Sequence, residues 1–147
     1  IKPCGLGARD SLRLEAGMPL YGHELTEAID PIAAGLHFAV KLDKGVGNNE
    51  AEPFIGQEAL QQIAENGPKQ KLIGLTLDGR RSPRQGMNVL NDEQVIGEVT
   101  SGCFSPTFEK PIAMAYINSD FEGDEVMIDF GRTQLPASVT KLPFYKR

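Results

Sequence analysis

The stretch MNVLNDEQVIGEVTSGCFS, residues 87–105, contains two apolar runs separated by Asn91 and Asp92. Asn and Asp between apolar runs are typical of a turn between two strands. Further short apolar runs lie on both sides of this stretch, at residues 71–78, 112–118, 125–130 and 135–145. Several short strands without intervening helices predict a small antiparallel barrel or sandwich.

The run EVMIDF, residues 125–130, shows the strand pattern in detail. Ile128 and Phe130 alternate with Asp129 and Gly131, which is the period-2 signature of a half-buried strand. Closing such strands into a barrel would also remove the exposed edges of the sheet.

The composition changes near ENGPKQK, residues 65–71, and the pattern before this point is partly helical. FIGQEALQQIAENG, residues 54–67, places Leu60, Ile63 and Ala64 on one helical face and ends at Asn66-Gly67-Pro68. IDPIAAGLHFAVKLD, residues 29–43, predicts a helical turn opened by Asp30-Pro31 and then a strand from His37 to Leu42.

The overall charge argues against two classes of partner. The formal net charge is −5 and the pI is near 5.0, whereas general nucleic-acid binders carry a basic footprint. No apolar run approaches the roughly 18 residues needed to span a bilayer. We therefore expect no nucleic-acid partner and no membrane partner.

The first residue is Ile1 rather than methionine, so we expect a processed chain or a piece of a longer protein.

The residue types that commonly carry metal or nucleophilic chemistry lack the spacing for it. His23 and His37 show no metal-ligand spacing, and Cys4 and Cys103 match no zinc motif. We therefore expect no metal. The two cysteines fit either one disulfide or two buried free thiols, and the second reading is favoured. GVGNN, residues 45–49, lacks the Lys-Ser/Thr of a phosphate loop and is interpreted as a turn.

Arginines are concentrated in DGRRSPRQG, residues 78–86, at positions 80, 81 and 84. Such a loop can bind an acidic partner or a phosphate. It can equally be a solvated turn between strands, which is the favoured interpretation, and the sequence leaves both open.

GLGARDSLRLEAG, residues 5–17, predicts a short amphipathic helix. Arg9 and Arg13 lie one turn apart on one face of that helix. A fixed guanidinium suits a carboxylate or a heterocycle edge that offers acceptors. For Arg13, however, pairing with Asp10 inside the helix is the favoured interpretation. The spacing alone predicts no function.

Several long motifs resemble one family. GLGARDSLRLEAGMPLYGHEL, FIGQEAL, GRRSPRQGMNVLNDEQVIGEVTSGCFSPTFEKPIAMAYI and the closing KLPFYKR occur in that order, and together they are similar to aminomethyltransferases, the T-proteins of the glycine cleavage system. The resemblance covers essentially the whole chain. It implies that about the N-terminal three-fifths of a full-length member is missing. In the three-domain cloverleaf of this family, the chain is an α+β fragment followed by an all-β antiparallel barrel. Residues 1–66 are then the remnant of the folate-binding α+β region, and residues 67–147 are the C-terminal β-barrel domain.

The resemblance also implies an activity and its site. Members transfer the methylene of the aminomethyl group on lipoylated H-protein to tetrahydrofolate, with release of ammonia. The catalytic aspartate of the family lies in the absent part, so no catalytic residue is assigned and the fragment is expected to be inactive alone. Arg9 matches the folate-contacting arginine of the family, and Tyr145 and Arg147 are further folate-binding candidates.

The alternative is a non-catalytic folate- or partner-binding barrel module, such as the tail of a protein like dimethylglycine or sarcosine dehydrogenase. In that reading Arg9 has a purely structural role. The expected location is the bacterial cytoplasm, or the mitochondrial matrix for a eukaryotic member. A cut through the folate region would expose apolar surface, which favours self-association of the fragment.

Overall fold

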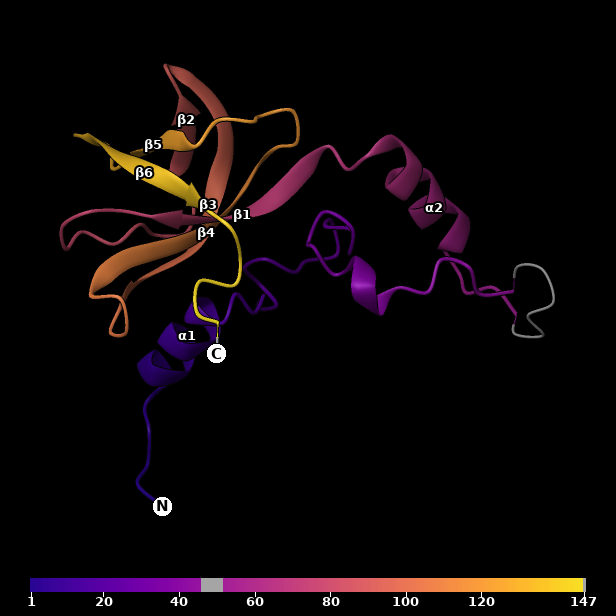
Figure 1. Ribbon diagram of the computed structural model, residues 1–147, viewed down its shortest axis with the longest axis horizontal. Coiled ribbons are helices and arrows are strands. Elements are labelled where there is room, and N and C mark those ends of the chain that lie inside the picture. Colours follow the sequence, from indigo (N-terminus) through magenta and orange to yellow (C-terminus); the bar gives the residue numbers. More distant parts are fainter. Residues whose placement is uncertain (46–51, 147) are drawn as a thin grey trace.

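The computed structural model of the chain describes residues 1–45 and 52–146. In this part of the chain two helices precede six strands (Figure 1). The helices are α1, Leu6–Glu15, and α2, Gln57–Asn66, with a short 3-10 turn at His37–Ala39 between them. The strands are β1, Gln70–Thr76; β2, Asn88–Asn91; β3, Gln94–Ser105; β4, Lys110–Asn118; β5, Glu125–Asp129; and β6, Gln134–Thr140.

The six strands form one closed barrel in the order β1-β4-β3-β2-β5-β6, and β6 pairs back onto β1. Every pair is antiparallel. The predicted barrel is confirmed, and the sandwich alternative is wrong because a sandwich would leave the sheets open at their edges. At the tightest point of the β3–β4 pair, a Cβ on Gly97 would lie 1.9 Å from the backbone oxygen of Tyr116, so only glycine fits there.

Strand β4 is buried on both of its faces, and this explains its continuous apolar run. Ala113, Ala115 and Ile117 point into the barrel, where they join the main core. Ile112 and Met114 point outward and pack under Leu14 of α1. A strand that is covered on both sides carries apolar residues at every position instead of every second one.

Helix α2 is confirmed and stands away from the barrel (Figure 1). It ends before Gly67, whose φ is +81°. Its only buried residue is Gln57, whose side-chain amide donates to the carbonyl oxygens of Leu42 at 3.1 Å and of Lys44 at 2.7 Å. Hydrogen bonds to the preceding loop, rather than apolar packing on the barrel, therefore hold the start of α2.

The helical turn opened by Asp30 is confirmed, but the strand predicted from His37 to Leu42 is wrong. The Asp30 carboxylate accepts from the backbone N–H groups of Ile32 and Ala33 at 2.9 and 2.8 Å. A 3-10 turn, His37–Ala39, then replaces the strand. No neighbouring strand is available to pair with this segment in the described part of the chain, and an apolar run without a partner does not form a stable strand.

The last predicted strand is shorter than its apolar run. Strand β6 ends at Thr140, and residues 141–146, which we call the C-terminal tail, leave the sheet and run back to α1 (Figure 1). Of the predicted GVGNN turn, Gly45 has the positive φ of a turn residue, +77°. Residues 46–49 lie outside the described residues.

Two further findings concern the whole described chain. None of the helices at residues 1–45 and 52–146 combines the length and apolarity that crossing a membrane requires. Both cysteines are free thiols, and Cys4 is exposed while Cys103 is half-buried. The expectation of two buried thiols therefore fails for Cys4, because the residues before α1 have no element packed over them.

Candidate functional site

Helix α1 lies against the outer face of the barrel, next to strands β3 and β4 (Figure 1). Leu14 is fully buried in this contact and packs with Ile112 and Met114. The two arginines of the predicted amphipathic helix thus sit on an element that is fixed to the barrel.

The Arg13 guanidinium is fully engaged. Its Nε donates to Asp10 at 2.9 Å, Nη1 to Glu24 at 2.9 Å, and Nη2 to the Ser101 hydroxyl at 2.8 Å. A further Nη1 contact reaches the carbonyl oxygen of Met18 at 3.5 Å. The predicted pairing of Arg13 with Asp10 is confirmed, and tertiary contacts that the sequence did not indicate use the remaining donors.

Glu24 is the buried partner of Arg13 and has no exposed surface. Its carboxylate also accepts from the Thr100 hydroxyl at 2.7 Å and from the backbone N–H of Leu20 at 2.9 Å. The Tyr116 hydroxyl donates to the Glu24 carbonyl oxygen at 2.9 Å. Burial, and then the charge of Glu24, raise the pKa of Tyr116 to about 12, so this hydroxyl keeps its proton.

A bulge in β3 supplies the Thr100 contacts. The register of β3 against β4 shifts between Val99 and Ser101, and a bulge of this kind frees the polar groups of the extra residue. The carbonyl oxygen of Thr100 lies 3.0 Å from Nδ1 of His23. Because a carbonyl only accepts, the histidine Nδ1 is the donor in this contact. His23 therefore has a structural partner in the barrel.

Arg9 contrasts with Arg13 on the same helix. Its side chain is exposed, and within residues 1–45 and 52–146 no ion pair includes it. A free guanidinium on a braced helix offers planar donors to an incoming acceptor. Arg9 is therefore available for a ligand, and Arg13 is not.

The C-terminal tail brings a second predicted residue onto α1. The backbone N–H of Tyr145 donates to the carbonyl oxygen of Glu15 at 2.8 Å. Glu15 lies six positions after Arg9, which is about 9 Å along the helix axis. The Tyr145 side chain is 47% exposed. Arg147, the third predicted residue, lies outside the described residues.

The arginine loop at residues 78–86 has a partly structural role. The Arg81 guanidinium lies 4.7 Å from the centre of the Phe130 ring and donates to the Thr133 hydroxyl at 2.8 Å. Arg80 and Arg84 are exposed. These contacts give Arg81 a structural role between the loop and the residues that follow β5.

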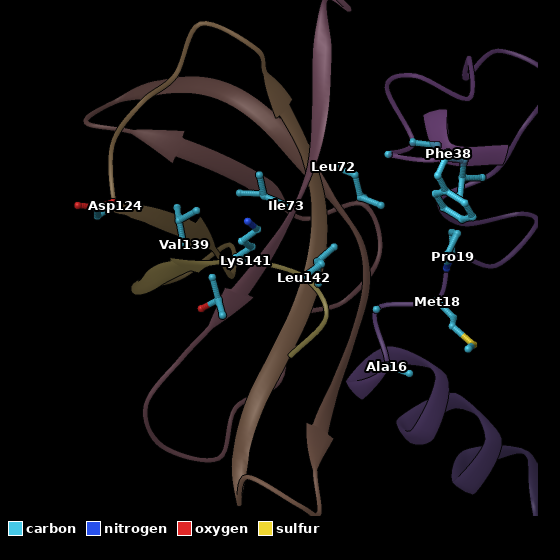
Figure 2. Close-up of a pocket in the computed structure, with 15 residues that line it drawn as sticks. Ala16, Met18, Pro19, Phe38, Leu72, Ile73, Asp124, Val139, Lys141 and Leu142 are labelled. Atoms are coloured by element: carbon cyan, nitrogen blue, oxygen red, sulfur yellow. The ribbon is translucent and has the colours of Figure 1, made fainter. Parts of the chain in front are cut away.

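A mostly apolar groove of about 750 Å³ lies between the loops that follow α1 and the side of the barrel formed by β1 and β6 (Figure 2). In Figure 2 Met18, Pro19 and Phe38 lie on one side, and Leu72 and Leu142 lie on the other. No local sequence pattern indicates this groove, since it forms only when segments far apart in the chain come together. Its charged lining residues are Asp124 and Lys141.

Neither a metal nor a reactive thiol stands out. Within the part of the chain that the structure describes, no three His, Cys, Asp or Glu side chains are grouped to hold a metal ion. Burial, and then the charges of Asp10 and Glu15, raise the pKa of the Cys103 thiol to about 11. This thiol is therefore protonated near neutral pH and is a poor nucleophile.

Together these features define a closed six-stranded antiparallel barrel, braced on its outside by a helix that carries one engaged and one exposed arginine. Residues 70–146 match the family model described as the glycine cleavage T-protein C-terminal barrel domain, and residues 1–44 match the GCVT N-terminal domain. The chain belongs to the glycine cleavage T-protein family.

Relatives and a solved structure agree with this assignment. The chain is 50% identical over 146 residues to an aminomethyltransferase of Symbiobacterium thermophilum, covering 98% of this chain and 37% of that protein. It is 47% identical over 149 residues to an aminomethyltransferase of Halalkalibacterium halodurans, covering 100% of this chain and 39% of that protein. The crystal structure of glycine cleavage system aminomethyltransferase T from Bartonella henselae superposes with a TM-score of 0.84 at 37% identity, over 96% of this chain and 39% of that chain. The chain thus spans less than two fifths of the length of each of these proteins.

Proposed function

We propose that the protein carrying this chain is a folate-dependent aminomethyltransferase of the glycine cleavage system. It takes the aminomethyl group that lipoylated H-protein carries and transfers the methylene to tetrahydrofolate. The carbon–sulfur bond to the lipoyl arm and the carbon–nitrogen bond to the amino group break, and the methylene carbon forms new bonds to N5 and N10 of tetrahydrofolate, which gives 5,10-methylenetetrahydrofolate. The two protons displaced from these nitrogens go to the amine, which leaves as ammonia, and to the lipoyl sulfur, which returns to a thiol.

The family membership and the aminomethyltransferase names of the relatives support this reaction class. The observation that carries the site is the contrast within α1, where Arg13 has partners for its donors and Arg9 is left exposed. A purely structural role for Arg9, as in the alternative of a non-catalytic barrel module, would call for a partner like those of Arg13.

In this proposal Arg9, Tyr145 and Arg147 bind and orient tetrahydrofolate. An arginine contributes planar hydrogen bonds to acceptors of the ligand, and holding the ligand in a reactive geometry lowers the barrier without proton transfer by these residues. Residues 1–66 form the remnant of the folate-binding region, and residues 67–147 form the C-terminal barrel domain. The proposal also places the catalytic aspartate in the part of the protein that lies outside this chain, and it places the protein in the bacterial cytoplasm.

The test of the site is Arg9→Ala in the full-length protein that carries this chain. Loss of a charged hydrogen bond should weaken tetrahydrofolate binding about tenfold to hundredfold and lower methylene transfer. Arg132→Ala is the matched control, since Arg132 is an exposed arginine beyond β5. Unchanged binding and transfer in a folded Arg9→Ala protein would exclude the ligand role of Arg9.

A second test uses the 147-residue chain by itself. We expect weak or no tetrahydrofolate binding by calorimetry and no methylene transfer, because in this proposal half of the walls of the folate channel lie outside this chain. Micromolar binding by the isolated chain would contradict this expectation and favour the binding-module alternative.

A further inference from the structure

The last carbonyl of helix α1 is satisfied by the C-terminal tail. The final four carbonyls of a helix have no partner inside it. Here the N–H groups of Ala16, Met18 and Gly17 donate to the carbonyls of Leu12, Arg13 and Leu14, respectively, and the last two of these bonds form a Schellman motif at Gly17. The fourth carbonyl, that of Glu15, accepts from the N–H of Tyr145 at 2.8 Å.

The side chain of the same residue is fixed to the turn between β3 and β4. Glu15 is only 5% exposed. Its Oε1 accepts from the Ser105 hydroxyl at 2.5 Å and from the Thr107 N–H at 3.2 Å, and its Oε2 accepts from the Thr107 hydroxyl at 2.7 Å. Glu15 therefore ties the helix to the barrel through its side chain and to the tail through its backbone.

The C-terminal tail lies so close to two glycines that a side chain at either position would crowd it. Phe144 packs against the buried cluster that includes Leu14. A Cβ on Gly74 would lie 2.9 Å from the Phe144 ring, and a Cβ on Gly17 would lie 3.1 Å from Cα of Pro143. The backbone of the tail is thus held closely, while the Tyr145 side chain stays half exposed.

We propose that Glu15 is a positioning residue for the folate site, acting through the tail: it fixes the place on α1 where Tyr145 is held. The tail starts at the end of β6 and is bound to α1 five residues later, so its path depends on where α1 lies relative to the barrel. The Glu15 carboxylate fixes the last turn of α1 to the turn between β3 and β4, and the Glu15 carbonyl oxygen accepts from the Tyr145 N–H. The part of this inference that concerns folate rests on the proposed function.

The tail itself is tested in the 147-residue chain labelled with 3-fluorotyrosine. The chain has three tyrosines and no tryptophan, and Tyr145→Phe identifies the Tyr145 signal in fluorine NMR. Glu15→Leu should move that signal to the position of a mobile tyrosine and leave the signals of Tyr21 and Tyr116 in place. Glu58→Leu, an exposed glutamate on α2, is the matched control and should change none of them.

A milder pair of variants covers the case in which Glu15→Leu does not fold. Thr107→Val removes the hydroxyl that donates to Oε2 and should displace the Tyr145 signal, whereas Thr107→Ser keeps a hydroxyl and should restore it. If the Tyr145 signal stays unchanged in a folded Glu15→Leu protein, or in folded Thr107→Val where Glu15→Leu does not fold, the inference is overturned.

The link to folate is tested by a double-mutant cycle in the full-length protein. Glu15→Leu should weaken tetrahydrofolate binding about threefold to tenfold, and this effect should vanish when Tyr145→Ala is already present. Additive effects would overturn the positioning role. Absence of folate binding by the unmodified protein would instead overturn the proposed function and with it the folate part of the inference, while the NMR result on the tail would stand separately.

Discussion

The barrel and the segment before it bury their apolar residues in different ways. In the barrel, residues such as Leu75, Val99 and Ile128 have no exposed surface, and they share one core. In residues 1–45 and 52–66, large apolar side chains stay exposed, including Leu6 at 84%, Phe38 at 80% and Ile55 at 104%. In the closed sheet each strand pairs with two neighbours, and apolar side chains fill the interior. The earlier segment relies instead on polar contacts with its neighbours.

Those polar contacts are concentrated at α1. Arg13 and Glu24 form a buried ion pair beside the bulge of β3, and Glu15 accepts from the turn between β3 and β4. The segment is thus attached to the barrel at two polar points around Leu14. The difference teaches that the barrel carries the stability of the chain, while the attachment of α1 depends on individual side chains that substitutions can remove.

The largest expected effect comes from Arg13→Met. This change leaves the Glu24 carboxylate, which has no exposed surface, without its cation, and such a loss costs about 3–5 kcal/mol in the free energy of unfolding. Arg9→Met on the same helix should change it by less than about 0.5 kcal/mol, since Arg9 is exposed. Chemical denaturation followed by circular dichroism measures both. Equal effects of the two variants would show that the buried pair does not hold α1.

A core substitution compares the two regions directly. Ile128→Ala empties a site in the barrel with no exposed surface and should lower the free energy of unfolding by about 2–5 kcal/mol. Ile63→Ala in α2 removes the same atoms from a half-buried position and should cost less than about 1 kcal/mol. Thermal unfolding of the two variants decides. A larger loss for Ile63→Ala would place the main core outside the barrel.

The alkylation rates of the two cysteines test the same contrast between the barrel and the segment before it, and this test needs no substitution. Cys103 in β3 is half-buried, and burial followed by the charges of Asp10 and Glu15 raises the pKa of its thiol from 9.0 to about 11. Its thiolate is then about a hundredfold scarcer than that of an ordinary thiol at pH 8. In alkylation at that pH, Cys4 should react quickly and Cys103 at least about a hundredfold more slowly. Two fast thiols would mean that this part of β3 opens readily.

The smallest effect is the acid sensitivity of the Glu15 attachment. Burial raises the pKa of Glu15, but the hydroxyls of Ser105 and Thr107 and the Thr107 N–H together hold it below its ordinary value of 4.5. A lowered folded-state pKa gives stability that is fully present above 4.5 and is lost as the pH falls through the folded value. Thr107→Val removes one donor, so its stability should fall less steeply than that of the unmodified chain below pH 4.5. Denaturation from pH 6 to pH 3 measures the two slopes, and a steeper fall in the variant would contradict the assignment.

Much of this architecture could be predicted from local patterns. The apolar runs placed all six strands, and the two runs predicted within residues 87–105 correspond to β2 and β3 on either side of the turn at Asp92. The GARDSLRLEAG motif likewise predicted α1 and the pairing of Arg13 with Asp10. Such features depend on residues close together in the chain, whose periodicity and turn chemistry are visible without the fold.

Other features could not be predicted because they depend on distant partners. The apolar run from His37 to Leu42 has the pattern of a strand, but none of the strands in residues 1–45 and 52–146 pairs with it, and a 3-10 turn forms instead. The apolar run at residues 135–145 predicts one continuous strand, yet the C-terminal tail leaves the barrel after Thr140. It does so because Phe144 packs against the buried cluster that includes Leu14 of α1. Only packing decides between such outcomes.

The sequence by itself determined the strands, the two helices, the family resemblance and the candidate residues Arg9 and Tyr145. Only the tertiary structure decided which arginine of α1 stays exposed and which residue binds the backbone of Tyr145. The local sequence indicates only the pairing of Arg13 with Asp10, whereas the contacts of Arg13 with Glu24 and Ser101 appear only in the folded chain. Glu24 and Ser101 lie 11 and 88 positions from Arg13 in the chain. Hydrogen bonds to them depend on the three-dimensional fold, and the periodicity of the sequence does not indicate which residues the fold brings together.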